Sequence, residues 1–235
     1  MADRERWLQI LRADDIAADQ RPQRIAEECV HLLGVTGAGI SIVSDTGNRA
    51  VVCATDGVSA RIEELQVTLG EGPCVDAVGR AGPVLVGDLL DNHDVSVERW
   101  PTFLRAAHEV GVRAVFAFPM RVGALGIGAV DLYRSTPGSL SEEELSGALI
   151  AAELAGVAVL GLRADADAGF VEDADNGAYL AQVHQATGMV MVQLGISVDE
   201  AFLLLRARAF AAGRPLRDVA TDVVQRRLRF SEEDG

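Results

Sequence analysis

Apolar positions along this chain of 235 residues recur with two periods, which alternate along most of its length. Short runs with apolar residues at every second position predict strands, and longer runs with apolar residues every three or four positions predict helices. Strands are predicted at 38–44, 49–55, 83–86, 112–122 and 125–133, and helices at 22–34, 58–66, 73–79, 98–110 and 141–163. Strand pairs joined by short turns and interleaved with helices indicate an α+β fold, in which helices flank an antiparallel sheet.

The last predicted helix of this region has two features that bear on its partners. Ser141 and Glu144 form a capping box that opens it. Its apolar stripe is broad and rich in small side chains, so it either closes the sheet or pairs with its twin in a homodimer. The stripe consists of Leu145, Leu149, Ala152, Gly156, Val159 and Leu160.

Residues 179–230 follow a helical pattern throughout and predict a small all-α bundle of three helices. Gly195 suits the position that closes the first helix. Ser197 and Glu200 form a second capping box that opens the next helix. Pro215 fits the first turn of the third helix, where its missing N–H costs nothing.

The segment 163–178 is acidic and contains few large apolar residues, so it is either a linker or a solvated extension of the preceding helix. The predicted organisation is therefore a first domain over 1–162, this acidic segment, and a helical domain over 179–230. No apolar run approaches the roughly 20 residues that span a bilayer. A charged N-terminus and an odd number of cysteines favour a cytoplasmic protein with reduced thiols.

Charge is distributed unevenly over these domains. Residues 1–175 hold 28 acidic residues and 14 arginines, whereas 176–230 hold 4 acidic residues and 7 arginines. A basic module at the end of an acidic chain indicates a polyanionic partner for that module. Either the acidic domain restrains the basic one, or its acidic residues only maintain solubility. The complete absence of lysine excludes a phosphate-binding loop that needs one, a Schiff-base enzyme and a phosphoacceptor receiver domain.

The helical domain resembles the ANTAR domain, a three-helix RNA-binding module of bacterial transcription antiterminators. The resemblance rests on the pattern A-x-G-x-x-M, then G-I-S-x-x-E-A, then L-L-R, then R-P-L-x-D-V-A. It implies binding of structured RNA, as a pair of small hairpins read by a dimer. The RNA-binding residues it suggests, with the neighbouring arginines, are Ala186, Thr187, Gly188, Arg206, Arg208, Arg214 and Arg217. Thr187 departs from the family, which often has a basic residue there.

The first domain resembles the GAF fold, a module that senses small ligands. The sequences LGEGPCVDAV, WPTF, GVRAVFAFPMRVG and LGIGAVDLYR carry this resemblance over about residues 20–162. They are similar to the GAF domain that precedes ANTAR in actinobacterial regulators. The resemblance implies a possible small-molecule ligand without identifying it, because GAF domains bind cyclic nucleotides, haem, tetrapyrroles or no known ligand. The cofactor is therefore left open.

Candidate sensor residues in the first domain are few: Cys74, Trp100 and Phe103. Cys74 follows Gly-Pro at a predicted helix N-terminus, where the helix dipole would lower the pKa of its thiol. The alternative is an inert core cysteine. Trp100 and Phe103 either line a pocket or pack in the core. No metal-site motif and no hydrolase motif occurs, so neither a metal nor a catalytic residue is predicted.

Together these features predict a signal-responsive regulator that binds hairpins in nascent RNA and prevents transcription termination, and that is not an enzyme. One alternative is a cysteine-dependent redox enzyme such as a methionine sulfoxide reductase, with Cys53 and Cys74 as the reacting thiols. Another is a protein-interaction module without an RNA role. The target transcript, the signal and the direction of regulation stay open.

Overall fold

A five-stranded antiparallel sheet forms the centre of the first domain, with strand order β2-β1-β5-β4-β3. The computed structural model describes Trp7, Gln9, and residues 16–43, 49–91, 99–123, 125–167 and 175–231. The strands are β1 (Gly37–Val43), β2 (Arg49–Ala54), β3 (Val84–Val86), β4 (Ala114–Val122) and β5 (Leu125–Arg134). The helices of this domain are η1 (Ala18–Gln20), α2 (Arg21–Leu33), α3 (Gly57–Leu69), α4 (Pro73–Arg80), α5 (Pro101–Glu109) and α6 (Glu142–Asp167).

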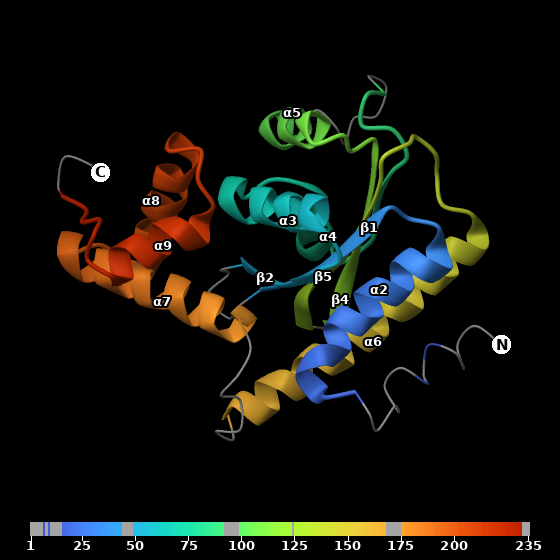
Figure 1. The fold of residues 1–235 in the computed structure, drawn as a ribbon, viewed down its shortest axis with the longest axis horizontal. Coiled ribbons are helices and arrows are strands. Elements are labelled where there is room, and N and C mark those ends of the chain that lie inside the picture. The colour runs from blue at the N-terminus through green and yellow to red at the C-terminus, as the bar shows by residue number, and fades with distance from the viewer. Residues whose placement is uncertain are drawn as a thin grey trace.

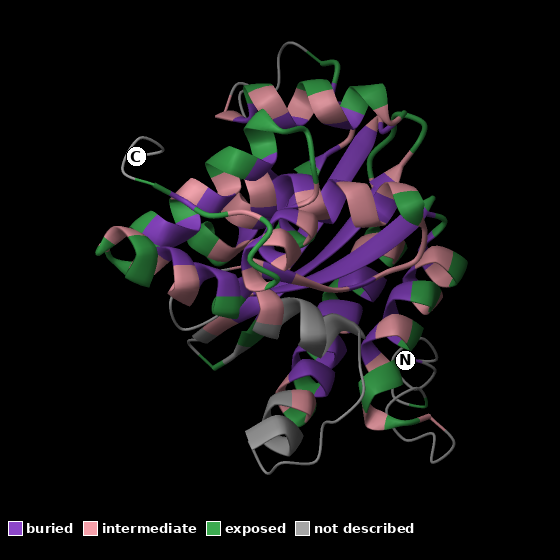
Figure 2. Ribbon diagram, turned by 60° about the vertical axis from the view of Figure 1, so that its left-hand side comes forward, coloured by how far each residue is buried: buried purple, intermediate pink, exposed green. Residues whose placement is uncertain are grey.

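Helices cover both faces of this sheet (Figure 1). Helices α2 and α6 lie on one face, and α3, α4 and α5 lie on the other. Because side chains alternate across a strand, Phe116 and Leu132 join the apolar cluster under α2 and α6, whereas Val115 and Tyr133 join the cluster under α3 and α5. Strands β1, β4 and β5 are consequently buried along most of their described length, whereas β2 is mostly half-buried (Figure 2). The predicted α+β fold with a helix-flanked antiparallel sheet is confirmed.

The boundaries of several elements differ slightly from the prediction. Helix α4 continues one residue past Gly79 to Arg80, and its C-cap, Ala81, adopts a left-handed conformation with φ of 55°. Helix α3 begins one residue earlier than predicted, after a capping box of Asp56 and Ser59, and ends three residues later, at the left-handed Gly70. The turn predicted at 45–48 and the beginning of the helix predicted at 98–110 lie outside the described residues.

Helix α6 closes the sheet through its small side chains. Ala151 and Ala155 are fully buried, and a Cβ at Gly156 would lie 3.6 Å from Ile127. The expectation that no apolar run approaches membrane-spanning length was wrong, since Glu142–Leu162 is long and apolar enough by length and composition, with a mean hydropathy of 2.0; half of this segment is buried. Such burial is typical of the core helix of a soluble domain. The capping box of Ser141 and Glu144 is present, with backbone-to-side-chain hydrogen bonds of 2.6 and 3.2 Å.

The C-terminal region consists of α7 (Asp175–Leu194), α8 (Val198–Ala211) and α9 (Leu216–Val224). Gly195 ends α7 with φ of 66°, and Ser197 and Glu200 cap α8 as predicted. A cap of this type stabilises a helix by about 1 kcal/mol. Pro215 differs from its prediction, since it is the N-cap of α9 rather than its first residue.

The acidic segment is in part a helix extension. Helix α6 runs to Asp167 and α7 begins at Asp175, four residues before the predicted start. Residues 168–174 between these helices lie outside the described residues. The bundle then packs against the first domain, with α8 beside α3 and α7 beside β2 (Figure 1).

Candidate nucleic-acid interface and buried acidic cluster

The arginines of the C-terminal bundle do not form one surface. Arg206 and Arg217 face α3 of the first domain. Arg208, Arg214 and Arg227 line a hollow on the outer side of α8 and α9. The sequence analysis treated these arginines as one group because they are close along the chain. In the structure they lie on two different surfaces of the bundle.

Arg206 binds the C-terminal end of α3. Its Nε donates a hydrogen bond of 2.8 Å to the backbone carbonyl of Thr68. The carbonyls at the end of a helix carry partial negative charge, so a guanidinium there is favourable. Gly70 closes α3 with φ of 67°, and a side chain on Gly70 would collide with the Arg206 guanidinium. Arg206 is half-buried in this contact and also lies over the ring of Phe202.

Arg217 lies next to the same helix. Its Nε is 3.7 Å from Oε1 of Glu64, a residue of α3. The Arg217 side chain is 62% exposed, so this ion pair is screened by water and contributes at most about 1 kcal/mol. Two of the arginines predicted to bind RNA therefore contact the sensor domain in this arrangement.

The outer hollow has a volume of about 310 Å³ and is open to solvent. Arg208 is exposed on its rim. Arg214 and Arg227 both pair with Asp222, at 2.8 and 2.6 Å. Hydrogen bonds from these two arginines lower the pKa of Asp222 below its usual range, so the carboxylate is charged and offsets part of the positive charge of the hollow.

The three residues of the A-x-G motif that were predicted to bind RNA differ in their burial. Ala186 is fully buried and Thr187 is 1% exposed. The Thr187 hydroxyl donates to the Val183 carbonyl at 2.7 Å, within its own helix. Direct contact of these two side chains with RNA is therefore excluded in this conformation, and their role is in the core. Gly188 is partly exposed, and nothing lies within 4 Å of the position that a Cβ would occupy.

Sequence reasoning missed an exposed apolar group on the bundle. Leu203 and Phe210 of α8 are 58% and 59% exposed. They are seven residues apart, so they lie on one helix face. Exposed aromatic rings stack on unpaired bases in RNA-binding proteins. The sequence does contain a sign of this group: Phe210 lies between Arg208 and Arg214, outside the apolar stripe of its helix.

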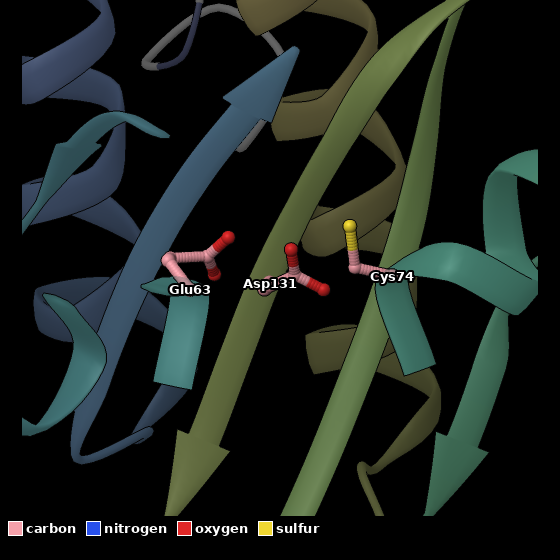
Figure 3. Close-up of side chains that lie close together, drawn as sticks. All are labelled: Glu63, Cys74 and Asp131. Carbon is pink, nitrogen blue, oxygen red and sulfur yellow. The ribbon is translucent and has the colours of Figure 1, made fainter. Parts of the chain in front are cut away.

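A second group of functional side chains lies inside the first domain. Glu63 of α3, Cys74 at the start of α4 and Asp131 of β5 converge from three elements (Figure 3). One ligand atom from each lies within 4.8 Å of the other two. Glu63 and Cys74 are 1% exposed and Asp131 is 7% exposed. The sequence predicted no metal site, yet the fold brings together three side chains of the kinds that bind metals.

Sheet register makes room for this acidic cluster. Gly39 of β1 pairs with Asp131 of β5, so both face the same side of the sheet. A Cβ on Gly39 would lie 2.6 Å from Oε1 of Glu63. The absence of a side chain at position 39 therefore allows the Glu63 carboxyl to lie beside Asp131.

Burial dominates the electrostatics of the cluster. Burial and the charge of Asp131 raise the pKa of Glu63 well above its usual range. Burial raises the pKa of Asp131 to about 7. One oxygen of each carboxyl, Oε2 of Glu63 and Oδ2 of Asp131, has no hydrogen-bond partner among the described residues. Such orphaned buried oxygens are costly and call for an explanation.

Cys74 lies at the helix N-terminus that the sequence predicted, but its thiol is not activated there. Burial, followed by the charges of Asp131 and Glu63, raises its pKa rather than lowering it. Several contacts hold the residue: its amide donates to Gln66 Oε1 at 2.7 Å, Ser41 Oγ lies 3.2 Å from Sγ, and Arg49 donates to Sγ at 3.3 Å. The Cys74 side chain also hydrogen-bonds that of Asp131. The expectation of a low-pKa thiolate from the helix dipole alone was wrong.

Trp100 and Phe103 are core residues. They pack edge to face with ring centres 6.4 Å apart, and both are almost fully buried. Of these two aromatic residues, Phe103 lines the cavity beside the cluster and Trp100 does not. Glu63, Gln66 and Asp131 also line this cavity. That cavity has a volume of about 10 Å³, which is close to the minimum for one water molecule.

Comparison with protein families agrees with this architecture. The GAF domain model matches residues 22–160. The chain belongs to the GAF domain family. The ANTAR domain model matches residues 179–224, so the GAF domain precedes an ANTAR domain in this chain. The two models carry no information about the source organism, and an actinobacterial origin stays a prediction. No curated protein matches the chain.

Solved structures support the GAF fold alone. The GAF domain of a phosphoenolpyruvate-protein phosphotransferase from Coxiella burnetii aligns with a TM-score of 0.54 and 14% identity, covering 71% of this chain and 95% of that one. The corresponding GAF domain from Acinetobacter gives 0.53 and 12%, covering 69% and 93%.

Proposed function

We propose that this GAF–ANTAR protein is a signal-responsive antitermination regulator that binds hairpins in nascent RNA through its C-terminal bundle. The observation that carries the proposal is the outer hollow of α8 and α9, where Arg208, Arg214 and Arg227 surround an open concave surface. Arginine suits RNA because its planar fork binds phosphate bidentately and stacks on bases. Phe210, exposed on α8, offers a ring for an unpaired base of a hairpin loop.

The contact with α3 supports a signal-responsive mechanism. Arg206 and Arg217 contact the GAF domain in this arrangement, so they belong to a closed state in which only part of the basic surface is accessible. Separation of α8 and α9 from α3 would release Arg206 and Arg217 from these contacts. The closed and open states would thus differ in RNA affinity, which is what a signal has to change.

A regulator fits the described residues better than the alternative enzyme. A methionine sulfoxide reductase needs a reactive thiol, and reactive thiols have lowered pKa values. Burial raises the pKa of both Cys53 and Cys74. The protein-interaction alternative, without RNA, does not account for the arginine-lined hollow.

The remaining features of the proposal follow the sequence. The domains extend over 1–162 and 179–230, joined by 163–178. The protein acts in the cytoplasm as a homodimer, because two hairpins need two bundles. The GAF domain receives the signal as a small ligand.

Salt dependence of RNA binding tests the proposal. Binding of the full-length protein to an RNA with two short hairpins should weaken as salt rises, because bound arginines release counterions from phosphates. Changing Arg208 and Arg214 together to Ala should lower affinity and reduce the slope of log affinity against log salt by about 1.5. Fluorescence anisotropy over a salt series measures both quantities.

The matched control removes the same charge elsewhere. Arg80 and Arg105 are exposed on α4 and α5, and changing both to Ala should leave the slope unchanged. RNA binding that is insensitive to salt, or that falls equally in both double variants, would contradict a specific role for the hollow.

A further inference from the structure

We propose that Glu63, Cys74 and Asp131 form a binding site for one borderline divalent metal ion, of which Zn²⁺ is the type. The cluster brings one thiol and two carboxyls together in the interior of the GAF domain, with ligand atoms within 4.8 Å of one another. Buried charges in proteins are either paired or coordinate metals. The site goes beyond the proposed RNA binding and does not depend on it.

The ligand chemistry selects the class of ion. A cysteine thiolate favours Zn²⁺ and similar ions, whereas Mg²⁺ and Ca²⁺ prefer oxygen ligands alone. Cysteine sulfur and carboxylate oxygen both occur in zinc sites, at about 2.3 and 2.0–2.2 Å from the ion. The three protein ligands leave a fourth tetrahedral position, which is the arrangement of zinc sites that bind an exogenous ligand.

The orphaned oxygens support a ligand at this place. Glu63 Oε2 and Asp131 Oδ2 are buried, and neither has a hydrogen-bond partner in the described part of the chain. A metal ion between the carboxyls and the thiol would give buried carboxyl oxygens a partner. Metal–ligand distances of about 2.0–2.3 Å place tetrahedral ligand atoms roughly 3.5 Å apart, so the three ligand atoms would approach one another by about 1 Å on binding.

Neighbouring residues are placed as outer partners of such a site. Arg49 donates to Cys74 Sγ at 3.3 Å, and a nearby guanidinium favours the thiolate. Gln66 fixes the Cys74 backbone, and Gly39 leaves the space that Glu63 occupies. Hydrogen bonds from outer partners orient metal ligands and raise their affinity.

The size of the cavity favours an ion over an organic ligand. The space beside Glu63 and Asp131 measures about 10 Å³. A cyclic nucleotide, haem or tetrapyrrole needs a pocket on the order of 300–1,000 Å³. The rival explanation is a purely structural cluster, in which protonated carboxyls share hydrogen bonds beside the Arg49 guanidinium.

Metal titration of the full-length protein, first stripped with a chelator, separates these explanations. After reloading with Zn²⁺ and dialysis, we expect elemental analysis to find one Zn²⁺ per chain. Co²⁺ should give the near-ultraviolet charge-transfer band of a cobalt–thiolate bond, and Mg²⁺ should neither bind nor displace Co²⁺. The changes Cys74→Ser, Glu63→Gln and Asp131→Asn should each weaken binding by more than about 100-fold, since loss of an outer partner alone costs about 10–100-fold.

Cys53→Ser is the matched control, because Cys53 is a second buried thiol outside the cluster and its variant should keep full stoichiometry. Circular dichroism shows which variants are folded, and the conservative Cys74→Asp change should retain Zn²⁺ while losing the cobalt–thiolate band. Wild-type protein that holds no Zn²⁺, or a Co²⁺ band that persists in Cys74→Ser, overturns the proposal. Neither outcome bears on RNA binding, which is measured separately.

Discussion

At the scale of single residues, burial decides what the candidate side chains can do. Thr187 lies where the family often has a basic residue, and in this chain it is buried with its hydroxyl bonded to its own helix. Cys74 lies at a helix N-terminus, yet the loss of solvation outweighs the dipole and raises its pKa. Desolvation of a fully buried group shifts a pKa by up to several units, whereas a helix terminus contributes less than about 2 kcal/mol.

The carboxylate of Asp222 offsets part of the positive charge in the hollow of α8 and α9. Changing Asp222 to Asn removes the negative charge that offsets Arg214 and Arg227, and it should steepen the salt dependence of RNA binding by about 0.8 in slope, the effect of one net charge. Fluorescence anisotropy with the same hairpin RNA measures the change. Asp199→Asn, at an exposed position at the start of α8, is the control with equal charge. Weaker binding by Asp222→Asn alone would mean that its arginines must be held in place to bind.

At the scale of elements, α6 has two faces with different roles. Its small residues pack on the sheet, so the prediction that the apolar stripe of this helix closes the sheet is confirmed for these residues. Leu149 and Val157 instead remain on the opposite face, 48% and 53% exposed. They are eight residues apart, so they align along the helix. An exposed apolar stripe on a long helix is a feature of helix pairing.

The exposed face of α6 predicts the dimer contact. Changing Leu149 and Val157 to Glu should convert the dimer into a monomer at micromolar concentration, because the change places like charges in an apolar interface. Analytical ultracentrifugation measures the state of association. Leu85 and Leu90 are similarly exposed, and the same change there should leave the dimer intact. A wild-type protein that is monomeric both alone and with RNA would rule out this use of α6.

At the scale of the whole molecule, α3 connects the two candidate sites. Glu63 points into the buried cluster, and the next residue, Glu64, pairs with Arg217 of the bundle. The last turn of α3 holds Arg206 through the Thr68 carbonyl. A displacement of α3 on ligand binding would therefore change both contacts of the bundle. These contacts lead us to predict that the acidic domain restrains the bundle through α3 as well as through overall charge.

The restraint can be tested by weakening one contact. Changing Glu64 to Gln removes the ion pair with Arg217 and should raise the RNA affinity of the full-length protein by up to about fivefold at low salt, since an exposed pair contributes about 0–1 kcal/mol. Glu143→Gln removes one exposed charge on α6 and controls for total charge. Equal affinities of wild type and both variants across salt concentrations would show that the GAF domain does not inhibit through α3.

The sequence by itself determined the elements and the two families. Apolar periodicity, the capping boxes of Ser141 and Ser197 and the glycine at 195 are local signals, so they located most helices and strands. The motifs of both domains are also local. The concentration of arginines toward the C-terminus could also be recognised from the sequence, because it too is a local feature.

Tertiary structure alone decided which residues meet. Glu63, Cys74 and Asp131 are separated by 11 and 57 residues, and only the pairing of β1 with β5 and the positions of α3 and α4 bring them together. A single acid within the apolar run LGIGAVDLYR was the one local sign of this site. The division of the arginines between α3 and the outer hollow likewise depends on how α8 packs, because a helix fixes the direction of a side chain but not what lies opposite it.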